Sequence, residues 1–99
     1  MMPYEPIGAE AIVKRMTDLP HWQLADDSCS IARSFKFANF RAAFAFITEC
    51  AMMSEKLDHH PEWSNVYATV DVRLATHSAR GLTELDFQLA AAMDKAAAR

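Results

Sequence analysis

Three of the chain's four histidines fall in two short segments, and three acidic residues bracket the first of these segments. His59 and His60 are neighbours within the segment Glu55 to Trp63, and His77 follows Thr76 further along the chain. An imidazole has an unperturbed pKa of ~6.5, so it can give or take a proton near neutral pH, and a nearby carboxylate fixes its tautomer and biases its charge. The pattern indicates acid–base chemistry, provided that the fold brings the two segments together.

The composition favours one soluble domain over residues 1–99. The net charge of −3 and the scattered basic residues argue against a nucleic-acid surface, which needs clustered Lys and Arg. Cys29 and Cys50 fit no disulfide framework, which suggests a reducing compartment. The segment Met1 to Leu19 lacks the apolar run of a signal peptide, and the longest apolar run, Ala42 to Ile47, is too short to span a membrane. We expect a cytoplasmic protein without a membrane segment.

Hydrophobic periodicity predicts seven elements in the order α-β-β-α-β-β-α. The first helix runs from about Ala9 to Thr17, with Ile12, Val13 and Met16 on its apolar face. Alternating and β-branched residues predict two hairpins, made by strands 22–24 with 31–37 and 62–67 with 69–75. Two hairpins and three helices indicate an α+β fold, with a four-stranded antiparallel sheet covered on one face by helices.

The other two helices have recognisable starts. Asn39 is a plausible N-cap of the helix that extends to Leu57. In the last helix, which continues to Ala97, Thr83 as N-cap and Asp86 at N3 approximate a capping box, and Leu82 and Phe87 suit a hydrophobic staple. The apolar arc of the 39–57 helix is wider than one packed face needs, so we expect it also to meet another subunit, in a homodimer or homotetramer.

These residues resemble those of the pterin-4a-carbinolamine dehydratases, also called dimerisation cofactors of a hepatocyte nuclear factor. The family pattern of an acidic residue, His-His-Pro, an aromatic residue, a histidine and an aspartate is met by Glu55, His59-His60-Pro61, Tyr67, His77 and Asp86. Flanking residues agree as well, and the resemblance covers roughly Leu19 to Met93. Ser54 and Ala75 depart from residue types common in the family.

The resemblance implies a single-domain dehydratase that uses no metal or organic cofactor. Its substrate would be the 4a-hydroxy-tetrahydropterin released by aromatic amino acid hydroxylases, one of which is a candidate partner. Carried over to this sequence, the catalytic residues are His59, His60 and His77, with His60 chiefly orienting the substrate. The substrate would be bound by Asp58, His59, His60, Ala75, Thr76, His77 and Ser78, with Glu55, Asp86 and Trp63 as supporting residues.

Several structural interpretations compete with these roles. Asp86 is first of all a helix-cap residue, Glu55 could be a solvated charge, and Trp63 could belong to the core or to a pocket wall. A metal site is disfavoured because adjacent histidines rarely face one ion and no His-x-His or His-x-x-x-His spacing occurs. The competing function class is a non-enzymatic interaction module. Such a module would be a dimerisation or transcriptional cofactor, or a hydroxylase partner, and it would self-associate through the 39–57 helix.

Overall fold

The computed structural model describes residues 4–98 and contains the predicted order of helices and strands. The elements are α1 (Ala9–Met16), β1 (Gln23–Leu24), β2 (Ile31–Lys36), α2 (Phe40–Leu57), β3 (Glu62–Val66), β4 (Thr69–Leu74) and α3 (Glu84–Ala97). A short 3₁₀ helix that the sequence did not predict, η1 (His77–Ala79), lies between β4 and α3. The α+β prediction is therefore confirmed, with element ends that move by a residue or two.

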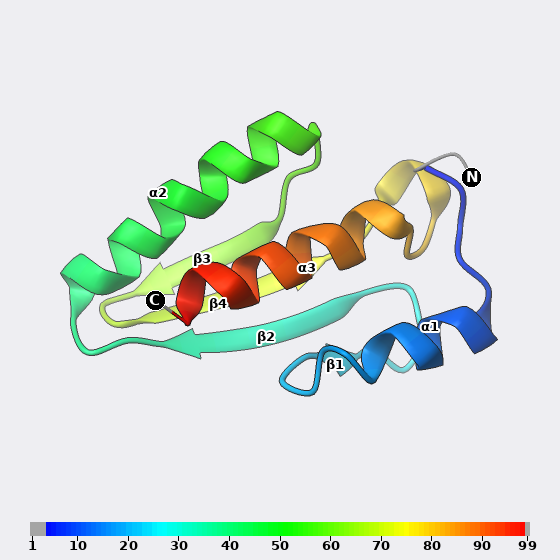
Figure 1. Cartoon of the computed structure of the whole chain (residues 1–99), viewed down its shortest axis with the longest axis horizontal. Coiled ribbons are helices and arrows are strands. Elements are labelled where there is room, and N and C mark those ends of the chain that lie inside the picture. Colours follow the sequence, from blue (N-terminus) through cyan, green and yellow to red (C-terminus); the bar gives the residue numbers. More distant parts are fainter. Residues whose placement is uncertain (1–3, 99) are drawn as a thin grey trace.

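The sheet is antiparallel throughout, with strand order β1-β2-β4-β3. Each hairpin pairs within itself, and the two hairpins join because β2 pairs with β4, from Ile31 opposite Leu74 to Lys36 opposite Thr69. Figure 1 shows α2 and α3 side by side over one face of this sheet. The central strand β4 thus leads directly from the middle of the sheet into η1.

The core fills the space between the sheet and the helices. Alternate residues of β4 point into it, as predicted: Val70, Val72 and Leu74 are buried, and Thr69, Asp71 and Arg73 occupy the other face. Phe35 of β2 packs against Phe46 of α2 with their ring centroids 4.6 Å apart. The other buried apolar side chains of this cluster come from α1, β2, α2, α3 and the connecting segments: Ile12, Leu19, Trp22, Ile31, Ala43, Cys50, Leu82, Phe87, Leu89, Ala90 and Met93.

Two helices bury only part of their apolar residues. Ile12 of α1 is buried, but Val13 is exposed, because only one side of this short helix contacts the core. On α2, Ala43, Phe46, Cys50 and Ser54 are buried while Phe40 and Phe44 stay exposed, so the apolar arc is indeed wider than the sheet can cover.

Candidate functional site

The seven residues expected around a substrate all line one hollow of about 310 Å³. The end of α2 supplies Asp58, His59 and His60, and the chain after β4 supplies Ala75, Thr76, His77 and Ser78, while Tyr4 of the N-terminal segment completes the lining. The fold thereby brings together two segments that are well separated along the sequence. Both segments hold their positions through backbone hydrogen bonds.

The end of α2 is a tight turn that places His59. Asp58 adopts the left-handed conformation, with φ 52° and ψ 44°. The Asp58 N–H donates to the carbonyl of Glu55, and the His59 N–H donates to the carbonyl of Ser54 at 3.0 Å, which together form a Schellman motif. Pro61 follows and keeps His60 out of a helical conformation. His59 consequently turns back under the helix end.

The segment after β4 is closed into a small loop. Thr76 and Gly81 form an isolated antiparallel bridge, in which the Thr76 N–H donates to the Gly81 carbonyl at 3.0 Å. Between them η1 carries His77, and Arg80 takes a left-handed conformation with φ 55°. The Thr76 N–H is already hydrogen-bonded within the loop, so it is not available to donate to a bound molecule.

A buried carboxylate holds His59. Asp86 is completely buried, and its Oδ1 lies 2.5 Å from Nε2 of His59, whose side chain is itself mostly buried. The other oxygen, Oδ2, accepts from the Thr83 N–H at 2.9 Å and from the Thr76 hydroxyl at 2.8 Å. Asp86 is therefore both the helix-capping residue that the sequence suggested and the partner of an imidazole.

The donors around Asp86 fix the direction of the whole network. The Thr76 hydroxyl has one proton and donates it to Asp86, so in its 2.8 Å contact with the Thr83 hydroxyl it must accept. With hydroxyl and amide donors on Oδ2, Asp86 is placed to accept from His59 as well. Because Nε2 of His59 then carries the hydrogen, the neutral ring has its lone pair on Nδ1.

The second nitrogen of His59 faces the hollow. Nδ1 of His59 has no hydrogen-bond partner among residues 4–98. In the same range, every fully buried side-chain nitrogen or oxygen atom has a hydrogen-bond partner. Nδ1 must therefore be accessible, and the accessible surface next to His59 is the hollow. Nδ1 can therefore accept a proton from a bound molecule when the ring is neutral, and can donate a proton to it when the ring is charged.

The other two histidines have carboxylate partners at the surface. Nε2 of His60 lies 2.6 Å from Oε1 of Glu55, and Nε2 of His77 lies 3.0 Å from Oε1 of Glu62. The same Glu62 oxygen accepts from Arg73 at 2.8 Å. Both pairs are at least half exposed, so solvent screens them, and their main effect is to orient the rings.

Sequence reasoning missed two residues of this site. Glu62 was not recognised as the partner of His77, although its position in a strand directly after Pro61 was a usable signal. Tyr4 lies outside the segment that carries the resemblance, and nothing in the sequence pointed to it. Trp63 is half-buried against the core and does not line the histidine hollow.

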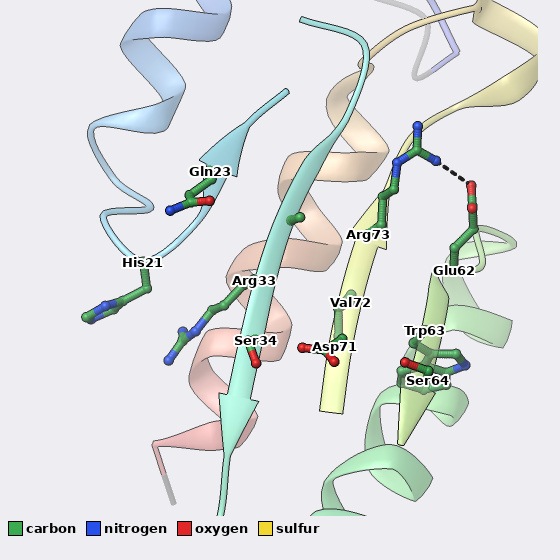
Figure 2. Close-up of a pocket in the computed structure, with 11 residues that line it drawn as sticks. His21, Gln23, Arg33, Ser34, Glu62, Trp63, Ser64, Asp71, Val72 and Arg73 are labelled. Atoms are coloured by element: carbon green, nitrogen blue, oxygen red, sulfur yellow. Dashed lines mark hydrogen bonds and ion pairs between the residues drawn. The ribbon is translucent and has the colours of Figure 1, made fainter. Parts of the chain in front are cut away.

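A larger hollow of about 680 Å³ lies on the open face of the sheet. Figure 2 shows its floor, where Ser34, Asp71 and Ser64 line up across β2, β4 and β3, with the Arg73–Glu62 ion pair at one end. Its one histidine, His21, has no carboxylate partner among residues 4–98. Acid–base chemistry therefore points to the smaller hollow, which contains three histidines.

Other reactive groups contribute little to the site. Burial raises the pKa of the Cys50 thiol to about 12, so it is not a thiolate nucleophile at neutral pH. Within residues 4–98, no group of three or more His, Cys, Asp or Glu side chains is arranged to hold a metal ion.

In the same range no helix is both long and apolar enough to cross a membrane.

Comparisons with known proteins agree on one family. The family model described as "Pterin 4 alpha carbinolamine dehydratase" matches residues 5–96. A protein of Sinorhizobium fredii named "Putative pterin-4-alpha-carbinolamine dehydratase" is 57% identical over 94 residues, which are 95% of this chain and 90% of that protein. A protein of Chelativorans sp. with the same name is 49% identical over 98 residues, which are 99% of this chain and 100% of that protein.

One solved structure extends this similarity to the fold. The "Crystal structure of transcriptional coactivator/pterin dehydratase from Brucella Melitensis" superimposes with a TM-score of 0.90 at 45% sequence identity. The match covers 94% of this chain and 99% of the other.

Proposed function

We propose that this chain, which belongs to the pterin-4a-carbinolamine dehydratase family, eliminates water from a 4a-hydroxy-tetrahydropterin to give the quinonoid dihydropterin. The observation that carries the proposal is the hollow in which His59 and His77, from separate segments, are both available to one ligand. The recycled pterin would be the cofactor of an aromatic amino acid hydroxylase. Both cysteines are unpaired, which suits a reducing compartment such as the cytoplasm.

The reaction requires two proton transfers. The bond between C4a and the hydroxyl oxygen breaks, and the departing group takes a proton to leave as water. The proton on N5 is removed, and the electron pair of the N–H bond forms the N5–C4a double bond. The elimination changes no net oxidation state, so one acid and one base suffice.

His59 and His77 supply the acid and the base. Asp86 holds the His59 ring through Nε2, so Nδ1 is the nitrogen that exchanges a proton with the substrate. Glu62 orients the ring of His77 in the same way. His60, held by Glu55, helps to orient the pterin together with the chain around Asp58 and from Ala75 to Ser78.

Direct measurement of turnover tests the proposal. Freshly generated 4a-hydroxy-tetrahydropterin is followed by its ultraviolet decay, with catalytic amounts of the protein and with buffer alone. We expect faster formation of quinonoid dihydropterin than the spontaneous reaction gives. A rate equal to that of buffer, with protein shown to be folded, would contradict the proposed activity.

A non-enzymatic role as an interaction module is the second candidate. Two observations favour it: Phe40 and Phe44 of α2 are exposed with ring centroids 5.7 Å apart, and the Brucella relative is titled a transcriptional coactivator as well as a dehydratase. The two roles are compatible in one protein. A His59→Ala variant that loses turnover and retains self-association would separate them.

A further inference from the structure

The N-terminal segment, which precedes α1, reaches the histidine hollow. The N–H of Ile7 donates to the carbonyl of Leu82 at 2.9 Å, and the partly buried Ile7 side chain packs against the core. Figure 1 shows this segment running beside η1 before it enters α1. Pro6 restricts the backbone between Ile7 and the hollow. The segment is thus anchored close to the site.

This anchoring places an aromatic ring in the wall of the hollow. Tyr4 lines it together with the histidine segments. Its side chain is 49% exposed, and no hydrogen bond or ring contact joins it to another residue within the range 4–98. In the absence of a ligand, part of an apolar ring is therefore left facing water at the mouth of the hollow.

We propose that Tyr4 is a substrate-binding residue whose ring packs against the pterin ring system. This inference rests on the proposed dehydratase function. A pterin is flat and conjugated, and aromatic rings attract each other in offset or edge-to-face arrangements. We assign the contact to the ring rather than to the hydroxyl, and the Tyr4→Phe variant tests this assignment. Tyr4 takes no part in proton transfer.

A contact of this kind affects binding and leaves the chemical step alone. We expect Tyr4→Ala to raise KM by about two- to tenfold, with kcat close to that of the unchanged protein. Tyr4→Phe retains the ring and should have a KM near the original. Val13→Ala, which shortens another exposed apolar side chain in the N-terminal region, is the matched control and should change neither constant.

Binding of oxidised biopterin, which cannot be dehydrated, provides a readout that does not depend on turnover. Isothermal titration calorimetry should show a Kd raised by Tyr4→Ala by the same factor as KM, and thermal unfolding should show that the variant is folded. An unchanged or lower KM and Kd would overturn the proposal, as would a loss of kcat alone.

Failure of the proposed function gives a different result. If the unchanged protein binds biopterin without accelerating dehydration, the dehydratase proposal is wrong, and the Kd of Tyr4→Ala still decides the role of Tyr4. If the unchanged protein neither binds biopterin nor accelerates dehydration, both proposals are overturned.

Discussion

At the residue scale, Asp86 combines two functions because its two carboxylate oxygens face different elements. Oδ2 caps α3 through the Thr83 N–H, and Oδ1 meets His59 across the hollow's inner wall. A buried carboxylate is costly unless each oxygen is hydrogen-bonded, and here both are. The start of a helix thereby becomes a rigid support for an imidazole.

Thr76 should act as a positioning residue through this carboxylate. Thr76→Val retains the shape of the side chain but removes one donor from Asp86 and leaves the Thr83 hydroxyl without its acceptor. Loss of a hydrogen bond to a charged group costs ~1.5–3 kcal/mol, and if ~1.4 kcal/mol of this affects the transition state, kcat falls about tenfold. Steady-state kinetics checks this, and Thr76→Ser should restore most of the rate. A Thr76→Val enzyme with full kcat would contradict the role.

The histidines that we propose as acid and base should be distinguishable from His21. We expect His59→Ala and His77→Ala each to lower kcat by ~10²–10⁴-fold, which is the usual contribution of a positioned acid or base. The measurement is the same dehydration assay, on both 4a stereoisomers. His21→Ala, remote from the hollow, is the control and should retain the full rate. If His77→Ala kept full rate on both stereoisomers, His77 would have no catalytic role.

At the element scale, the end of α2 decides where His59 points. The Schellman motif needs a left-handed residue at its turn, and that position is occupied by Asp58 rather than glycine. A side chain with a Cβ is strained there, and Asp is one of the few residues that tolerate the conformation. The chain thus reverses sharply enough to bring His59 beneath the helix.

The strain at Asp58 predicts an order of stabilities. Asp58→Gly should be more stable than Asp58→Ala by roughly 1 kcal/mol, because glycine adopts the left-handed conformation freely while alanine does not. Urea unfolding monitored by the Trp fluorescence gives the two midpoints. Equal midpoints would mean that the turn opens into another conformation when Asp58 is replaced.

At the scale of the whole molecule, the exposed part of α2 indicates self-association. Phe44 is 54% exposed and borders a hollow of about 240 Å³ that it shares with Ile47, Trp63, Ser64, Asn65 and Val70. The neighbouring strand β3 is an edge of the sheet. An exposed aromatic pair beside an apolar hollow is typical of a surface that another subunit covers.

Breaking this surface should lower the oligomeric state. We expect the protein to be at least a dimer and Phe44→Glu to shift it toward the monomer, because a buried charge without a partner opposes association. Sedimentation velocity at matched concentrations checks this. Val13→Glu, which places the same charge on an exposed apolar site of α1, should leave the assembly intact. A monomeric unchanged protein would show that the surface serves another purpose.

The sequence by itself determined the local features of this protein. Periodicity located the helices and strands, Asn39 and Thr83 marked the starts of α2 and α3, and each hairpin followed from short connections. These features depend on interactions between residues close in sequence, which composition and spacing reveal. The histidine segments could also be identified from the sequence, because the acid–base chemistry of an imidazole follows from the residue type.

Only the tertiary structure decided which distant groups meet. The pairing of β2 with β4, the placement of Glu62 beside His77, and the approach of Tyr4 to the hollow depend on how separate elements pack. The hydrogen bond that the Thr76 hydroxyl donates to Asp86 likewise became visible only in the structure. Contacts of this kind join residues that are far apart in the sequence, so no local pattern specifies them.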